Sequence, residues 1–92
     1  MNTILKSTPY CDLLAQGTTQ EGEDVSAVER IYVKDQKREE IRFAWYKLKD
    51  GKPQFQLRPL DLTEEELLLL FKDGLKEGVF SSEFRAKLKE QL

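Results

Sequence analysis

Asp50-Gly51 stands between two runs in which apolar residues alternate with polar ones, and this pattern constrains the fold more than any other feature of the chain. Asp-Gly is a preferred dipeptide of tight hairpin turns. Residues 40–60 also contain the single Trp of the sequence. The pattern therefore predicts a β-hairpin over this range.

The register of this hairpin depends on the kind of turn. A plain two-residue turn pairs Trp45 with Gln56, which places Phe55 on the face opposite Trp45. A type I turn with a left-handed glycine bulge pairs Trp45 with Phe55 and Phe43 with Leu57, which makes one face wholly apolar. We expect the bulged register, because the buried face of a sheet usually decides the pairing.

A strand at residues 27–34 and a charged turn at 35–39 precede the hairpin. Pairing Val33 with Ile41 then gives a three-stranded antiparallel meander over 27–60. The expected inner face consists of Ile31, Val33, Ile41, Phe43, Trp45, Phe55 and Leu57. Such a face needs a cover.

Residues 63–92 are expected to supply this cover as a helical hairpin. Thr63 and Glu66 have the spacing of a capping box, and Ser81 or Ser82 can cap a second helix. The fold class is therefore α+β, a three-stranded meander covered on one face by a C-terminal helical hairpin, in a single small domain of residues 1–92.

Residues 1–26 allow two interpretations. Thr8-Pro9 resembles a helix start, which favours a short N-terminal helix. The alternative is an irregular arm followed by the acidic loop at 17–24.

The composition narrows the chemistry. The chain has 92 residues, a net charge of −2, one cysteine and no histidine. We therefore expect no Cys/His metal site, no histidine-based catalysis, no cofactor and no enzymatic activity. No apolar run has the length of a membrane span, so we expect a cytoplasmic protein without membrane contact.

Basic and aromatic side chains share the expected outer face of the sheet. Arginines can hold phosphates and tyrosines can stack on unpaired bases, so this face is a candidate surface for single-stranded nucleic acid or a partner. The candidate residues are Arg30, Tyr32, Arg42, Tyr46 and Arg58.

Leu68 and Leu69 form a second candidate surface, because four consecutive leucines exceed what one helix face can bury. We favour a protein-interaction module that binds a partner protein or itself as a homodimer. Nucleic-acid binding is the alternative, and a small enzyme is less favoured.

A DNA-binding regulator is a further alternative. The succession of a strand at 54–58, a helix at 67–75 and a glycine-containing link at 78–82 loosely resembles ribbon-helix-helix proteins. The short link, the lack of a basic charge and the use of the strand in a hairpin argue against it.

Overall fold

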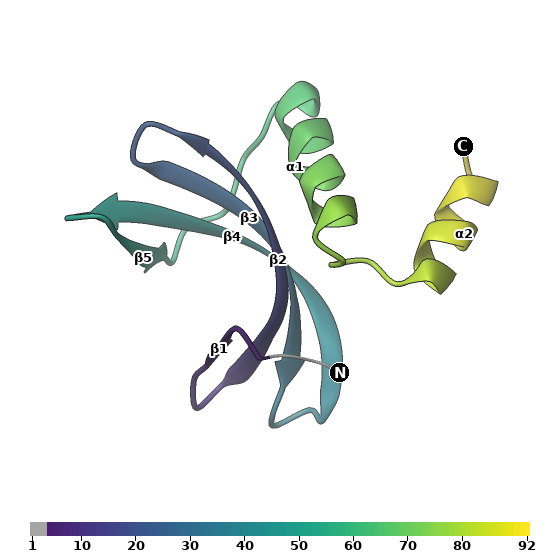
Figure 1. The fold of residues 1–92 in the computed structure, drawn as a ribbon, viewed down its shortest axis with the longest axis horizontal. Coiled ribbons are helices and arrows are strands. Elements are labelled where there is room, and N and C mark those ends of the chain that lie inside the picture. The colour runs from purple at the N-terminus through teal and green to yellow at the C-terminus, as the bar shows by residue number, and fades with distance from the viewer. Residues whose placement is uncertain (1–3) are drawn as a thin grey trace.

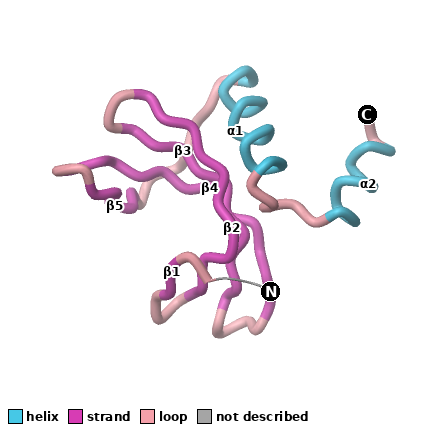
Figure 2. Tube along the Cα trace, in the orientation of Figure 1, coloured by secondary structure: helices cyan, strands magenta, loops and turns pink. Residues whose placement is uncertain are grey.

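The computed structural model describes residues 4–92 and confirms an α+β fold. An antiparallel five-stranded sheet in the order β1-β2-β3-β4-β5 is followed by two helices (Figure 1 and Figure 2). The strands are β1 (Lys6–Ser7), β2 (Cys11–Glu21), β3 (Asp24–Val33), β4 (Arg38–Lys49) and β5 (Lys52–Gln56), and the helices are α1 (Glu64–Lys76) and α2 (Ser82–Glu90). The predicted three strands are thus two too few.

The N-terminal region forms strands, so the prediction of a short helix or an irregular arm is wrong for residues 4–26. Residues 1–3 of that region lie outside the described residues. The Thr8 hydroxyl accepts hydrogen bonds from the backbone N–H groups of Tyr10, at 3.2 Å, and Cys11, at 3.1 Å. This side chain therefore stabilises the turn between β1 and β2, because threonine can close a turn with the same bonds that cap a helix.

The β4–β5 hairpin has the plain register, and the expected bulged register is wrong. Trp45 lies opposite Gln56, and Tyr46 lies opposite Phe55. Asp50 and Gly51 have φ values of 53° and 75°, so both turn residues are left-handed. This conformation is that of a type I′ turn, whose twist matches the twist of the flanking strands.

The β3–β4 pairing also differs from the expected one. Ile41 lies opposite Arg30 and Phe43 lies opposite Val28, whereas Val33 lies opposite Arg38. The turn occupies residues 34–37. Ile41 therefore pairs with Arg30 and not with the predicted Val33, which shifts the register by an odd number of residues. An odd shift moves a strand's side chains to the other face.

The expected single apolar face is therefore divided between two faces of the sheet. We name them by their surroundings: the helix face is the one that α1 covers, and the concave face is the opposite one. Directly paired residues share a face, so Val28, Arg30, Ile41, Phe43 and Trp45 belong to the helix face. Cys11, Leu13, Ile31 and Val33 form a buried cluster on the concave face.

The helix face is closed by α1, which packs on β2 and β3. Val28, Leu70, Val79 and Phe80 form its buried cluster. A Cβ atom on Gly17 of β2 would lie 2.5 Å from the backbone nitrogen of Gly74 in α1, so the helix approaches the strand at a place where neither residue has a side chain.

The two helices have the predicted caps but do not form a hairpin over the sheet. The capping box of Thr63 and Glu66 is present, and the Ser81 side chain accepts a hydrogen bond from the N–H of Phe84. However, α2 extends away from the sheet and has no buried residue (Figure 1). Its contact with the rest of the fold includes the Phe84 ring, stacked on Phe80 at 5.4 Å between centroids.

Candidate functional site

Glu29, in the middle of β3, is the one buried charged residue among those described, with a side-chain exposure of 0%. Along β3, Glu29 is an even number of residues from Ala27, Ile31 and Val33, so its side chain points to the same face. Its carboxylate therefore lies on the concave face. Glu29 is not among the residues predicted from the sequence. The sequence does carry a signal: Glu29 alternates with the apolar residues Ala27, Ile31 and Val33. A charged residue at such a position indicates a paired carboxylate, because burying an unpaired charge is costly.

Three side chains satisfy this carboxylate, and we call them with Glu29 the Glu29 network. Glu29 Oε1 accepts hydrogen bonds from Arg42 Nε and contacts Arg42 Nη2, both at 2.9 Å. Glu29 Oε2 accepts from Gln16 Nε2 and from the Tyr46 hydroxyl, both at 2.7 Å. The network joins β2, β3 and β4, so it fixes the side chains that line the centre of the concave face.

The network changes the proton affinities of two of its members. Burial, reinforced by the hydrogen bond to the Glu29 carboxylate, raises the pKa of Tyr46 well above its ordinary value. Burial opposes the charged form of Arg42, but the hydrogen bond and the attraction of Glu29 outweigh it and raise the pKa of that guanidinium. At neutral pH, Tyr46 is therefore a hydrogen-bond donor and Arg42 is a cation.

A groove runs along the concave face beside this network. Its two hollows, of about 240 and 360 Å³, share the side chains of Lys6, Leu13 and Tyr46. We call it the β1–β5 groove, because the β1–β2 region borders one side and the β4–β5 hairpin the other (Figure 1). Its further lining residues are Leu5, Thr8, Tyr10, Cys11, Gln16, Val25, Arg42, Leu48, Pro53 and Phe55.

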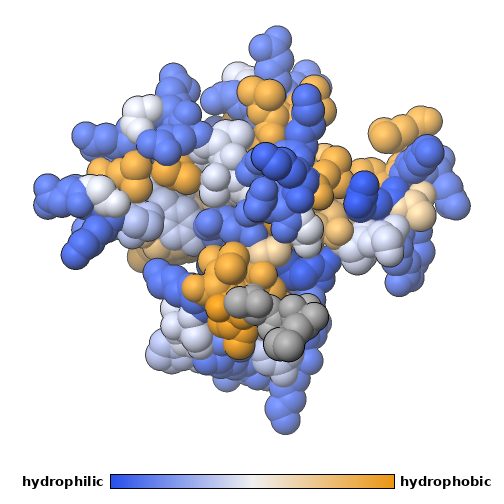
Figure 3. All heavy atoms as spheres, viewed as in Figure 1, coloured by the Kyte–Doolittle hydropathy of each residue, from blue (hydrophilic) through white to orange (hydrophobic). Residues whose placement is uncertain are grey.

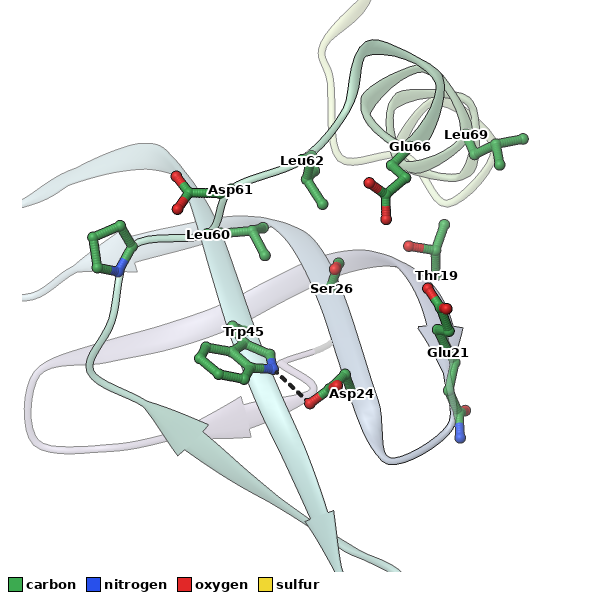
Figure 4. Close-up of a pocket in the computed structure, with 12 residues that line it drawn as sticks. Thr19, Glu21, Asp24, Ser26, Trp45, Leu60, Asp61, Leu62, Glu66 and Leu69 are labelled. Atoms are coloured by element: carbon green, nitrogen blue, oxygen red, sulfur yellow. Dashed lines mark hydrogen bonds between the residues drawn. The ribbon is translucent and has the colours of Figure 1, made fainter.

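A second depression, of about 440 Å³, lies on the helix face between Trp45 and the N-terminal half of α1. Figure 4 shows Glu66 and Leu62 pointing into it, with Trp45 on the opposite wall and Leu69 at the rim. Trp45 Nε1 donates a hydrogen bond of 3.2 Å to Asp24 Oδ1. We call this depression the acidic cleft, because its charged lining residues are Glu21, Asp24, Asp61 and Glu66.

The structure separates the predicted basic and aromatic surface into three places. Arg30 and Tyr32 belong to the helix face, where Arg30 Nε donates to the Val79 carbonyl at 2.7 Å. Arg42 and Tyr46 lie together on the concave face in the Glu29 network. Arg58 is exposed after the end of β5. The five residues therefore do not form the continuous outer face that the predicted register implied.

Leu68 and Leu69 are exposed at 61% and 57%, as expected for leucines that do not face the sheet. Apolar atoms gather on α1 and α2 in Figure 3. Of the two leucines, Leu69 borders the acidic cleft.

Within residues 4–92, no three His, Cys, Asp or Glu side chains are grouped closely enough to hold a metal ion. In the same range, each helix is too short or too polar to cross a membrane. Comparison with protein-family models, curated proteins and solved structures finds no match to this chain.

Proposed function

We propose that this chain is a protein-interaction module whose partner is a second copy of itself, bound through α2 and the acidic cleft. The observation that carries the proposal is the lack of any buried side chain in α2. A helix of nine residues is too short to be stable by itself in water. Within its own subunit α2 is supported by the stacking of Phe84 on Phe80, and the rest of its apolar surface is left for a partner.

The two surfaces have complementary chemistry. Phe84 and Leu88 lie one turn apart on α2, and basic side chains flank them. Those basic side chains are Arg85, Lys87 and Lys89. The acidic cleft offers carboxylates around the apolar surface of Trp45, Leu62 and Leu69. A helix with an apolar face and basic flanks fits this combination, because opposite charges set orientation while apolar area supplies affinity.

The pairing is expected to be symmetric. In a two-fold dimer, α2 of one copy occupies the cleft of its partner, and the partner's α2 occupies the first cleft. The contact is thus made twice. Each chain contributes both the helix and the cleft, so a change in either surface weakens both contacts.

A charge-reversal experiment tests this arrangement. The helix variant carries Arg85→Glu and Lys89→Glu, and the cleft variant carries Glu21→Lys and Asp61→Lys. Each variant alone should dissociate, with the dimer Kd raised at least about tenfold, or ~1.4 kcal/mol. An equimolar mixture should form heterodimers, because both contacts then join opposite charges. Sedimentation velocity over a range of micromolar concentrations measures each state.

A pair of adjacent leucines provides a matched control. Leu69→Lys should weaken the dimer, because Leu69 borders the cleft, whereas Leu68→Lys should not. A wild-type chain that is strictly monomeric at high micromolar concentration contradicts the proposal. So does a mixture of the two charge-reversed variants that shows no recovery.

A further inference from the structure

The β1–β5 groove has a charge pattern unlike that of the molecule. The chain carries 17 acidic and 15 basic residues. Both of the ionised side chains that line the groove are nevertheless cations, Lys6 and Arg42. Among the described residues, Lys6 has no carboxylate within salt-bridge distance. Lys6 therefore presents an uncompensated positive charge to the groove, whereas Arg42 is paired with Glu29.

Arg42 contributes directed donors as well as charge. Its Nε and Nη2 atoms engage Glu29, which fixes the plane of the guanidinium. Its Nη1 atom has the Cys11 sulfur at 3.8 Å, a weak acceptor. The side chain is 26% exposed and lines the groove. N–H groups of the guanidinium thus remain for an acceptor in the groove, held in place by a buried carboxylate.

The walls of the groove are apolar on both sides of these cations. Near Arg42 the wall is aromatic, with Phe55 set edge-on to Tyr46 at 5.6 Å between centroids. Beyond Lys6 the wall is aliphatic, formed by Leu5, Val25, Leu48 and Pro53. Arg42 therefore lines one hollow, Lys6 lies where the two hollows meet, and the second hollow offers hydrocarbon surface.

We propose that the β1–β5 groove binds a small amphipathic organic anion: a carboxylate at Arg42 and Lys6, with a short hydrocarbon body along Leu5, Val25 and Leu48. An arginine fork suits a carboxylate because two parallel N–H groups can meet its two oxygens. The larger hollow, of about 360 Å³, is in the size range of small-molecule sites, which combine apolar walls with a few oriented polar groups.

Octanoate is the probe, with octanol and inorganic phosphate as comparison ligands. Titration followed by ¹H–¹⁵N NMR at neutral pH should move backbone amide signals of Lys6, Cys11, Tyr46 and Phe55. Octanol should bind more weakly because it lacks the charge, and phosphate should bind more weakly because it lacks the hydrocarbon body. Equal affinity for octanoate and octanol overturns the anionic part of the proposal, and equal affinity for octanoate and phosphate overturns the apolar part.

Lys6→Gln tests the site without disturbing the fold, because Lys6 is exposed at the short edge strand β1. Octanoate affinity should fall about fivefold, as expected for one partly solvated charge. Lys52→Gln is the control, because it removes the same charge at a residue of β5 that does not line the groove. Arg42→Lys should lower the affinity further, because a point charge replaces the fork. Equal losses in the Lys6 and Lys52 variants overturn the proposal.

The same titration on the Arg85→Glu/Lys89→Glu variant separates this proposal from that of the dimer. Strands β1 and β5, whose residues line the groove, lie on the opposite side of the sheet from α2 (Figure 1), so octanoate should bind this variant as it binds the wild type. Signals that move only at Leu68, Leu69 or α2, or no binding at millimolar octanoate, overturn the groove assignment whatever the oligomeric state.

Discussion

The two faces of the sheet are held by different kinds of contact. On the helix face, α1 lies against β2 at Gly17 and Gly74, and an apolar cluster around Leu70 fills the space beside them. On the concave face, the sheet curls around its own side chains, and the Glu29 carboxylate holds three strands through hydrogen bonds. Close packing tolerates no added atom, whereas a polar network tolerates no missing partner. The faces should therefore respond to opposite kinds of substitution.

Gly17→Val should have the largest effect. Its Cβ would lie within 3 Å of the Gly74 and Asp73 backbone, which cannot move aside as a flexible side chain does. We expect a loss of more than about 4 kcal/mol in unfolding free energy, an exceptional value for one substitution. Urea unfolding measures it. Thr18→Val is the control on the other face of the same strand, and a comparable loss there would contradict the importance of this close contact.

Glu29→Gln should have the next largest effect, although it removes no volume. The substitution leaves Arg42 without its charged partner and replaces an oxygen acceptor with a donor. We expect a loss of about 3 kcal/mol, as for breaking a buried ion pair. The matched variant is Glu39→Gln, because Glu39 pairs with Arg30 at 2.9 Å but is 43% exposed. That variant should lose less than about 1 kcal/mol, and equal losses would remove the distinction between the two pairs.

Tyr46→Phe tests one hydrogen bond of the same network and should cost about 1.5 kcal/mol. It should also change the response to alkali. Because the pKa of Tyr46 is raised in the folded protein, its contribution is fully present below its ordinary pKa of 10.0 and is lost as pH rises through the raised value. Wild-type stability should thus fall above pH 10 more steeply than that of the variant, and parallel profiles would contradict this account.

The smallest effect concerns the cap of α1. Hydrogen bonds from the Thr63 backbone and side chain lower the pKa of Glu66 below its ordinary 4.5. Its contribution is therefore fully present above pH 4.5 and is lost as pH falls through the lowered pKa. Glu66→Gln keeps the capping geometry but should flatten this acid dependence in thermal unfolding. If the variant loses thermal stability at low pH as the wild type does, the charge of Glu66 does not contribute to this pH dependence.

The helices and their caps could be predicted from the sequence because their signals are local. The capping box of Thr63 and Glu66 and the Ser81 cap depend on residues close together in the chain. Strand β2 has no comparable signal: Gly17, Thr18 and Thr19 are typical of a loop, but they belong to a strand, and Gly17 is the place where α1 approaches it. Its strand character comes from tertiary contacts, which override local propensity.

The strand registers could not be predicted from the sequence on the assumption that only one face of the sheet is buried. This sheet buries residues on both faces, so maximising the apolar content of a single face selected the wrong pairing at both Trp45 and Ile41. The same assumption placed Arg42 and Tyr46 on a solvated surface, whereas on the concave face they form hydrogen bonds with the buried Glu29 carboxylate. The carboxylate of Glu29, which alternates with apolar residues in β3, is the sequence feature that indicates burial on both faces of the sheet.

The hydrogen bond of 2.7 Å from the Thr18 backbone N–H to Asp73 Oδ2 has a consequence for association. Strand β1 pairs with β2 only at Leu13 and Asp12, so the N–H of Thr18 belongs to a stretch of β2 that β1 does not reach. An open strand edge is a template for another chain, and covering its N–H groups is one way to block such growth. Because Asp73 of α1 accepts from this N–H, the group is not free to pair with a strand of another chain.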